Sequence, residues 1–302
     1  MSLAFFVTDR DISPLVSVIA RMAPEITIQV WPNLGAPDLI RMAVVWNSLP
    51  IQSSEMPALS LVTSFGAGVD QLVRDLSLVN FPIARIVDNG LSEQMARYVC
   101  GYILQHQVRI NELRSKQLNR NWSPEPQSDG RNVVILGAGN LGNTVKKALE
   151  ALAFNVVCWA KHCRPGVITG REALSTALSE ADYLVNVLPL TDQTLDILDA
   201  ELFNQCKPGC YLVNVARGQH LVERDLLEAL ESGQLSGATL DVFAVEPLPV
   251  SHPFWCHPKV NVTPHCSALT DQHAVSEQIV DNYRRLTTSR PLMNLIDRQA
   301  GY

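Results

Sequence analysis

Short apolar runs alternate with helical or irregular segments along the first third of the chain. Five β-rich runs occupy residues 3–8, 26–31, 43–46, 59–65 and 82–87, and helical or loop segments at 11–23, 36–42 and 69–77 separate them. Strands that alternate with helical patterns are typical of βαβ units, whose strands run parallel. The pattern therefore predicts a first α/β lobe of about 90 residues.

A long amphipathic stretch follows this lobe. Residues 92–119 contain no proline and a single glycine, Gly101, and their apolar positions include Met95, Val99 and Ile103. The length and periodicity predict one helix that spans two lobes. Residues 122–130 then predict an irregular linker.

The rest of the chain carries a second series of apolar runs. They lie at 132–136, 155–160, 182–188, 210–216, 238–243 and 259–263, and this rhythm predicts a six-stranded Rossmann-type sheet. Residues 270–286 predict a second crossing helix, and residues 290–302 would return to the first lobe. We expect an α/β fold of two doubly wound parallel-sheet domains. A substrate domain (1–92 plus 287–302) would hold an inserted nucleotide domain (93–286) that includes both crossing helices.

Composition and charge narrow the range of partners. Apolar residues make up 47% of the chain and charged residues 18%, as in globular proteins. The net charge of −6 argues against binding to nucleic acid or to an acidic membrane. No apolar run approaches the ~18 residues of a membrane span. The seven cysteines lack zinc-site spacing, so we expect reduced thiols in a cytoplasmic protein that binds no metal.

A glycine-rich turn follows the first strand of the second lobe. Gly137, Gly139 and Gly142 have the G-x-G-x-x-G spacing, between an apolar strand and a segment of helical periodicity. In a nucleotide-binding turn the first glycine permits the bend, the second lets the backbone approach a pyrophosphate, and the third lets the helix pack closely. The helix N-terminus adds free N–H groups and a favourable dipole. The alternative is a glycine-rich turn that binds nothing.

The next strand ends in a basic tip. An NAD-specific turn has an acidic residue about twenty positions beyond the glycines, where it binds the adenosine ribose. Here no acidic residue occurs between Glu150 and Glu172, and Lys161, His162 and Arg164 occupy the tip. These cations favour a 2′-phosphate, which predicts NADP(H) as cofactor and NAD(H) as the weaker alternative. They could also be solvated loop residues.

Three chemically distinct side chains follow consecutive strands of the second lobe. Arg217, Glu246 and His265 come after the strands at 210–216, 238–243 and 259–263, and ligands of such sheets bind at the carboxyl ends of strands. A guanidinium can hold a carboxylate, an imidazolium can protonate a carbonyl oxygen, and a carboxylate can orient the imidazole. The trio predicts hydride transfer to a 2-oxo acid. Taken singly, each could be a loop or structural residue.

These residues lie within motifs that are familiar as a set. Along essentially its whole length the chain resembles the D-2-hydroxyacid dehydrogenases, in Gly66-Ala67-Gly68-Val69-Asp70, the glycine turn, Leu188-Pro189-Leu190-Thr191, Asn214-Val215-Ala216-Arg217-Gly218, Leu240-Asp241-Val242-Phe243 and Pro264-His265. The intervals of 29 residues from Arg217 to Glu246 and 19 from Glu246 to His265 match the catalytic trio of that family. Within it the chain is most similar to the type A glyoxylate/hydroxypyruvate reductases, although their basic turn is more uniformly rich in Ser and Arg.

The resemblance implies a role for each matching residue and a flavodoxin-like fold for the substrate domain. Arg217 would bind carboxylate and carbonyl, Glu246 would orient His265, and His265 would donate the proton. The implied cofactor contacts are Gly137, Gly139, Asn140, Leu141, Gly142, Lys161, His162, Arg164, Leu188, Pro189, Thr194, Val215, Ala216 and Asp241. The implied substrate contacts are Trp46, Ala67, Gly68, Val69 and Arg217, where the backbone of residues 66–69 would form an N–H nest and Trp46 would keep the pocket small.

The expected function is therefore NADPH-dependent reduction of glyoxylate to glycolate and of hydroxypyruvate to D-glycerate. One alternative is the same chemistry on a larger 2-oxo acid, such as phenylpyruvate, against which Trp46 argues. Another is a binding protein that senses the nucleotide, against which the intact Arg217, Glu246 and His265 argue. The resemblance also implies a homodimer formed through the nucleotide domain.

Overall fold

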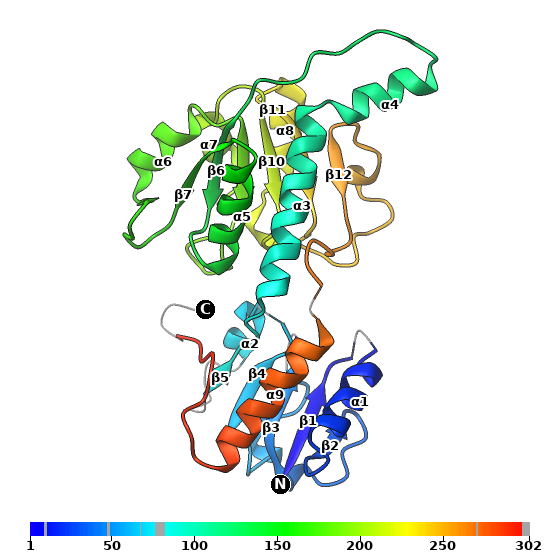
Figure 1. The fold of residues 1–302 in the computed structure, drawn as a ribbon, viewed down its shortest axis with the longest axis vertical. Coiled ribbons are helices and arrows are strands. Elements are labelled where there is room, and N and C mark those ends of the chain that lie inside the picture. Colours follow the sequence, from blue (N-terminus) through cyan, green and yellow to red (C-terminus); the bar gives the residue numbers. More distant parts are fainter. Residues whose placement is uncertain (9–10, 47–48, 67, 76–81, 270, 298–302) are drawn as a thin grey trace. The chain divides into compact units, whose positions relative to one another are not determined.

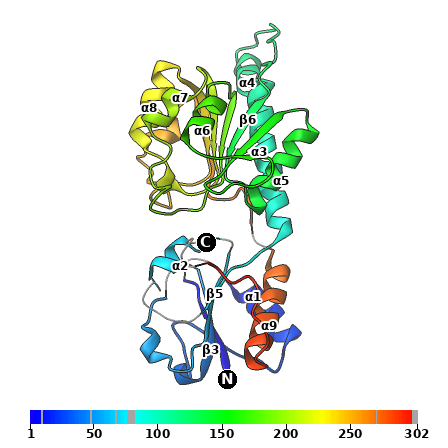
Figure 2. The ribbon, with the colours of Figure 1, turned by 90° about the vertical axis from the view of Figure 1, so that its left-hand side faces the viewer.

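The structure is a computed structural model that describes residues 1–302 with six gaps. The gaps are 9–10, 47–48, 67, 76–81, 270 and 298–302, and the side chains of Ser53, Asp70, Gln71, Asp75 and Asn89 are also outside the description. The chain divides into two compact units, Met1–Gly90 with Thr270–Tyr302 (unit 1) and Leu91–Leu269 (unit 2). Figures 1 and 2 show an α/β layer arrangement within each unit.

Unit 1 is a five-stranded sheet in the order β2-β1-β3-β4-β5, with every pair parallel. The strands are β1 (Ser2–Phe6), β2 (Thr27–Val30), β3 (Ile40–Val45), β4 (Leu61–Ser64) and β5 (Ile83–Ala84), and the helices are α1 (Ser13–Met22), α2 (Asp70–Asp75) and the short 3-10 turns η1 (Pro37–Leu39) and η2 (Ser53–Glu55). This is the flavodoxin-like strand order, which confirms the predicted fold. Alternate residues of β1 face opposite sides, so Leu3 and Phe5 join one apolar cluster while Ala4 and Phe6 join the other.

The second crossing helix belongs to unit 1, whereas the sequence predicts it in the nucleotide domain. The helix is α9 (Gln272–Thr287), and its buried residues Val275 and Ile279 lie in one cluster with Leu15 and Ile19 of α1. The apolar periodicity identified the helix but carried no information on which sheet it covers. The predicted return of the C-terminal segment holds for the described residues, since the backbone of Ile296 bonds to Ile83.

Unit 2 contains a seven-stranded parallel sheet in the order β12-β11-β10-β9-β6-β7-β8. Its strands are β6 (Asn132–Leu136), β7 (Asn155–Trp159), β8 (Val167–Ile168), β9 (Tyr183–Asn186), β10 (Cys210–Asn214), β11 (Leu235–Leu240) and β12 (Val260–Val262). The order reverses between β6 and β9, which is the switch point of a Rossmann-type sheet. Strand β8 was not predicted, because two residues are too short to give a periodic signal.

Helices cover both faces of the unit 2 sheet. Helices α3 (Asn89–Gln107) and α5 (Asn140–Ala151) pack on one face, and α6 (Arg171–Leu178), α7 (Ala200–Gln205) and α8 (Glu223–Ser232) pack on the other (Figure 2). The 3-10 turns η3 (Gly218–His220) and η4 (Pro253–Cys256) complete the unit. Within the described part of the chain, no helix has the length and apolar character needed to cross a bilayer.

The single helix predicted over residues 92–119 is two helices. α3 ends at Gln107 and α4 (Ile110–Leu118) begins three residues later, after Arg109, whose φ of 59° is left-handed. A non-glycine residue in this region interrupts the α-helical backbone. The sequence contains neither Gly nor Pro at this position, so the break had no sequence signal. Figure 1 shows α4 extending away from the sheet, and none of its nine residues is buried.

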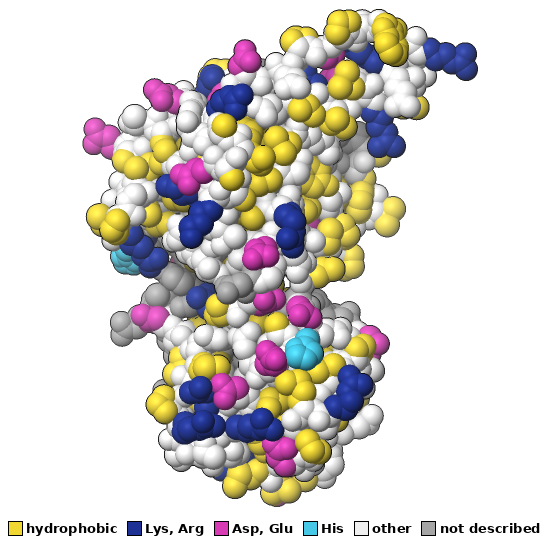
Figure 3. All heavy atoms as spheres, viewed as in Figure 1, with side chains coloured by type: hydrophobic (Ala, Val, Ile, Leu, Met, Phe, Trp, Pro, Cys, Tyr) yellow, Lys and Arg dark blue, Asp and Glu magenta, His cyan; other side chains and the backbone are white. Residues whose placement is uncertain are grey.

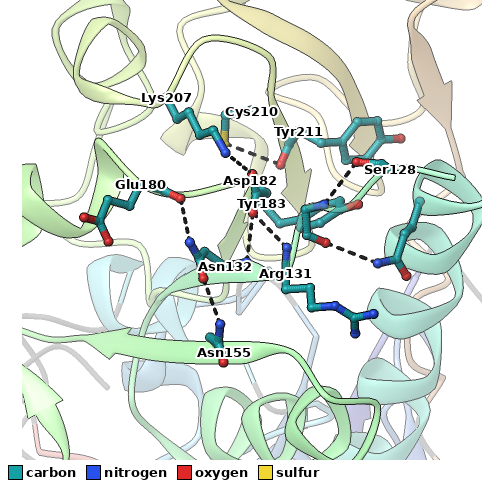
Figure 4. A network of polar contacts seen from close by, with 12 residues as sticks. Ser128, Arg131, Asn132, Asn155, Glu180, Asp182, Tyr183, Lys207, Cys210 and Tyr211 are labelled. Atoms are coloured by element: carbon teal, nitrogen blue, oxygen red, sulfur yellow. Dashed lines mark hydrogen bonds and ion pairs between the residues drawn. The ribbon is translucent and has the colours of Figure 1, made fainter.

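A polar network holds the amino ends of β6 and β9 together (Figure 4). Asp182, just before β9, accepts hydrogen bonds from the backbone N–H groups of Arg131 and Asn132 at 2.8 and 3.0 Å and from Lys207 Nζ at 2.6 Å. Burial raises the pKa of Asp182, but these hydrogen bonds outweigh it and hold the pKa below its usual value. The network thus fixes the edge of the sheet opposite the carboxyl ends of the strands.

Candidate active site

The glycine turn lies between β6 and α5, and its three glycines have different surroundings. Gly137 has a φ of 117°, which favours glycine. A Cβ on Gly142 would lie 2.0 Å from the carbonyl oxygen of Gly137, so the helix can pack this closely only without a side chain. A Cβ on Gly139 would meet nothing within 4 Å. The open space in front of Gly139 is where a pyrophosphate would need to approach the backbone.

The N-terminus of α5 presents backbone N–H groups at this turn. Gly139 is its N-cap and supplies no side-chain acceptor. Asn140 directs its amide to Ser92 Oγ at 2.8 Å, and Leu141 packs partly buried against the core. The first turn of α5 therefore has the geometry and dipole that suit an anion.

The basic tip follows β7. Lys161, His162 and Arg164 are all exposed, and among the described residues no carboxylate forms an ion pair with Lys161 or Arg164. The indole N–H of Trp159 donates to the Gly170 carbonyl at 3.0 Å and anchors the base of the loop. The cations are therefore available to a phosphate.

The loop after β9 carries Leu188, Pro189 and Thr194. Leu188 is buried, and the Thr194 hydroxyl donates to the Pro189 carbonyl at 2.7 Å and accepts from the Thr191 N–H at 2.8 Å. Thr194 thus shapes this loop from within. On the neighbouring strand end, Val215 and Ala216 are also buried.

The predicted trio is brought together at the ends of β10, β11 and β12. Nδ1 of His265 lies 2.8 Å from Oε2 of Glu246, and Oε1 of Glu246 accepts the Phe243 N–H at 2.9 Å. Partial burial raises the pKa of Glu246, but the hydrogen bonds from His265 and Phe243 and the charge of Arg217 outweigh it and lower the pKa. Glu246 is therefore ionised near neutral pH, and the imidazole is 40% exposed, so its Nε2 can reach a ligand.

Close backbone packing joins the Arg217 loop to the Glu246 loop. A Cβ on Gly218 would lie 1.8 Å from the carbonyl carbon of Phe243, so only glycine fits there. Gln219 also donates to the Ala244 carbonyl at 3.4 Å. Arg217 donates from Nη1 to the Ala216 carbonyl at 2.7 Å.

Asp241 lies at the end of β11, and its carboxylate supports the turn that carries His265. It is fully buried, with Oδ1 accepting from Thr263 Oγ1 at 2.6 Å and from the Cys266 N–H at 2.9 Å, while Oδ2 accepts the Ser267 N–H at 2.8 Å. His265 has a left-handed φ of 50° inside this turn. The resemblance implies that Asp241 contacts the cofactor, and the structure shows that its carboxylate also positions the His265 turn.

Unit 1 supplies the other predicted substrate residues. Trp46 packs edge-on against Phe65, and a Cβ on Gly66 would lie 2.7 Å from the Trp46 ring. The Gly66 N–H is bonded to Ser64 Oγ at 3.2 Å, and the Gly68 carbonyl accepts from the same hydroxyl at 2.9 Å. Val69 is buried, and Ala67 lies outside the described residues.

A buried polar cluster, which is not among the site residues predicted from the sequence, lies below the site. Asn186 and Asn214 are adjacent across β9 and β10, both are fully buried, and both bond to groups in the loops that follow, as does the fully buried His220. A signal was present: each strand ends in the tripeptide Leu-Val-Asn, a polar residue after a buried apolar run. Among the described residues, no group of His, Cys, Asp and Glu side chains is arranged to hold a metal.

Comparison with known proteins agrees with this geometry. The profile described as "D-isomer specific 2-hydroxyacid dehydrogenase, NAD binding domain" matches residues 100–267. The glyoxylate/hydroxypyruvate reductase A of Serratia proteamaculans is 36% identical over the full length of both chains. An NADPH-dependent glyoxylate/hydroxypyruvate reductase from Sinorhizobium meliloti, solved with NADP and sulfate, is 32% identical with a TM-score of 0.91 and covers 100% of each chain. A D-isomer specific 2-hydroxyacid dehydrogenase from Xanthobacter autotrophicus Py2, solved with NADPH and MES, also gives 32% and 0.91, covering 100% of this chain and 99% of that one. The chain therefore belongs to the D-isomer specific 2-hydroxyacid dehydrogenase family.

Proposed function

We propose that this protein is an NADPH-dependent reductase of small 2-oxo acids, which converts glyoxylate to glycolate and hydroxypyruvate to D-glycerate. The observation that carries the proposal is the distance of 2.8 Å between His265 Nδ1 and Glu246 Oε2. The charge of Arg217 also acts on this carboxylate and helps to lower its pKa. The relatives named above as glyoxylate/hydroxypyruvate reductases support the choice of substrates.

The residues of the glycine turn and the basic tip suit NADPH. Backbone at Gly139 and the first turn of α5 would hold the pyrophosphate, and Lys161, His162 and Arg164 would hold the 2′-phosphate. Leu188, Pro189, Val215 and Ala216 form the apolar strand ends beside them. Bound NADPH supplies the hydride.

The trio of unit 2 would act on the oxo acid. The guanidinium of Arg217 binds the substrate carboxylate and polarises the adjacent carbonyl. The imidazolium of His265 donates its Nε2 proton to the carbonyl oxygen, since Nδ1 is occupied by Glu246. The ionised Glu246 stabilises the protonated ring before transfer, and acid catalysis of this kind contributes about 10²–10⁴-fold.

Trp46 would limit the size of the substrate. Its ring lies against Gly66 and Phe65, so the indole is held in one place by packing. A rigid indole beside the backbone at Gly66 leaves room for a small group on the oxo acid and opposes an aromatic one.

We also propose that the enzyme is a cytoplasmic homodimer that associates through unit 2. Figure 3 shows hydrophobic and basic side chains together on α4, and Ile110, Leu113, Leu118 and Trp122 are exposed large apolar residues. The first three lie on α4, which buries none of its residues, and Trp122 follows the helix; an exposed apolar set of this kind favours a protein partner. All seven cysteines are free thiols, which suits a reducing compartment.

The test is a panel of 2-oxo acids followed by NADPH absorbance, with His265→Gln as the paired variant. We expect glyoxylate and hydroxypyruvate to oxidise NADPH, phenylpyruvate to react far more slowly, and His265→Gln to lose about 10²-fold or more in kcat. Absence of His265-dependent turnover with both small acids would refute the proposal. Faster turnover of phenylpyruvate would replace the proposed substrate class with a larger one.

A further inference from the structure

His220 lies beneath the proposed site with its side chain fully buried. It follows Arg217 by three residues, at the end of the short turn η3. Its Nδ1 lies 3.0 Å from Asn186 Nδ2 and 3.3 Å from the backbone nitrogen of Arg217. Its Nε2 lies 3.3 Å from the Pro189 carbonyl oxygen. One imidazole thus contacts the Arg217 loop through one nitrogen and the Pro189 loop through the other.

The partners of the ring define its protonation. The amide nitrogen of Asn186 and the backbone nitrogen of Arg217 both carry hydrogen and can only donate, so Nδ1 must be the unprotonated acceptor. The Pro189 carbonyl can only accept, so Nε2 must carry the proton. In a protonated ring, Nδ1–H would point at two groups that also donate hydrogen. The ring is fully buried, so no water is available to accept that hydrogen bond. The network therefore requires the neutral ring with its proton on Nε2.

The two asparagines fix the orientation of this network. Asn186 accepts the Leu188 N–H at 3.1 Å and donates to Asn214 Oδ1 at 3.1 Å. Asn214 accepts the Ala216 N–H at 3.3 Å and donates to the Arg217 carbonyl at 3.2 Å. Every one of these bonds ends on the backbone of a loop or on another member of the network. Since all of these side chains are buried, the bonds are not exchanged with water.

We propose that His220 is a positioning residue whose neutral imidazole ties the loop that carries Pro189 to the loop that carries Arg217. The proposal rests on the proposed function, in which the Pro189 loop lines the cofactor and Arg217 binds the substrate carboxylate. The Nε2–H bond sets the Pro189 carbonyl, and the Nδ1 acceptor sets the Arg217 backbone. Nε2 therefore affects binding of the cofactor, and Nδ1 affects binding of the substrate.

Two substitutions separate the two nitrogens. In His220→Asn the amide oxygen replaces Nδ1, so the Arg217 N–H keeps its acceptor while Pro189 loses its donor. In His220→Gln the longer amide reaches Pro189 as a donor, while the Arg217 N–H loses its acceptor. Thr194 also donates to the Pro189 carbonyl, so the cofactor loop is loosened and not released.

The experiment measures NADPH affinity by fluorescence quenching and the KM for glyoxylate by turnover. We expect His220→Asn to raise the NADPH Kd about fivefold with the glyoxylate KM within about twofold of wild type, and His220→Gln to give the reverse pattern. His106→Asn is the matched control, because both ring nitrogens of His106 also have hydrogen-bond partners, Tyr183 and Ser236, at the amino ends of β9 and β11. It should change thermal stability and neither constant.

A second measurement needs no variant and no turnover. The ¹⁵N spectrum of histidine-labelled wild-type protein should show the His220 ring as the neutral Nε2–H tautomer at pH 7. The signal is assigned to His220 by its loss in either variant. If neither variant folds, it is assigned by its couplings. A protonated ring or an Nδ1–H tautomer at His220 would overturn the proposal. Equal changes in both constants that merely follow the loss of stability would also overturn it. If wild type binds NADPH but reduces neither acid, the proposed function is refuted. The tautomer of His220 and the NADPH affinities of the variants still test whether His220 connects the two loops.

Discussion

Nδ1 of His265 lies 2.8 Å from Oε2 of Glu246, and the second oxygen of that carboxylate accepts the backbone N–H of Phe243 at 2.9 Å. The backbone bond keeps the carboxylate from rotating away, so the imidazole is held with Nε2 directed elsewhere. Because the pKa of Glu246 is lowered, the carboxylate carries its charge throughout the neutral range and stabilises a protonated His265.

Glu246→Gln tests this relationship. The amide can still accept from Phe243 but no longer offers a negative charge to the imidazole. We expect kcat/KM for glyoxylate reduction to fall about 10²-fold, because the imidazole that donates the proton loses the negative charge that faces its Nδ1.

Glu223→Gln is the control for that experiment. Glu223 Oε2 pairs with His252 Nε2 at 3.1 Å on α8, outside the proposed trio. Its kcat/KM should match wild type. A kcat/KM of Glu246→Gln equal to that of wild type would show that the charge of the carboxylate does not assist His265.

The exposed cations after β7 predict cofactor preference. Removing both charges in a Lys161→Ala, Arg164→Ala variant should raise the KM for NADPH at least tenfold, since each charge-assisted hydrogen bond contributes about 1.5–3 kcal/mol. The KM for NADH should change less than twofold, because NADH has no 2′-phosphate. Lys147→Ala removes another exposed cation from unit 2, on α5, and should alter neither KM. Equal increases for both cofactors would contradict the assignment of the tip to the 2′-phosphate.

The sequence predicted those parts of the molecule that have a local periodic or spacing signal. Both parallel sheets, the glycine turn and the ends of β10, β11 and β12 could be located because apolar runs mark strands and the carboxyl ends of parallel strands share one edge. The contact of His265 with Glu246 followed from that shared edge without any knowledge of distances.

The features that were missed depend on tertiary context. The left-handed Arg109 has no glycine or proline to announce it, and the packing of α9 on α1 depends on which sheet its apolar face meets. The task of Asp241 at the His265 turn requires knowing that Thr263, Cys266 and Ser267 fold back onto the carboxylate. None of these features produces a periodic pattern in the sequence.

Gly142 is closely packed and Gly139 faces open space, so substitutions at the two positions should affect stability and cofactor binding separately. Gly142→Ala places a methyl 2.0 Å from the Gly137 carbonyl oxygen and should lower the free energy of unfolding by about 1–3 kcal/mol. Gly139→Ala meets open space at a φ of −79° and should leave thermal stability nearly unchanged, while weakening NADPH binding at least tenfold because the methyl occupies the approach to the backbone. Thermal unfolding and NADPH titration of both variants measure the two effects. Unchanged NADPH affinity in Gly139→Ala would show that the pyrophosphate does not bind at this turn.

The Asp182 network predicts how stability depends on pH. The pKa of Asp182 is lower in the folded protein than the ~3.9 of an unfolded chain, so ionised Asp182 stabilises the fold above that value, and this stability is lost as the pH falls through the folded pKa. In Asp182→Asn the amide oxygen can still accept from the Arg131 and Asn132 N–H groups, but the bond from Lys207 is lost.

We therefore expect Asp182→Asn to lower the free energy of unfolding by about 1 kcal/mol at pH 7, a modest loss because the Lys207 side chain is half exposed. The difference from wild type should shrink as the pH is lowered below about 4 and also as salt is raised, since both weaken the ion pair. Urea unfolding at several pH values measures it, with Asp192→Asn at an exposed position showing how much comes from net charge alone. A difference that stays constant from neutral to acid pH would mean that the charge of Asp182 contributes nothing and that only its hydrogen bonds to the backbone support the sheet.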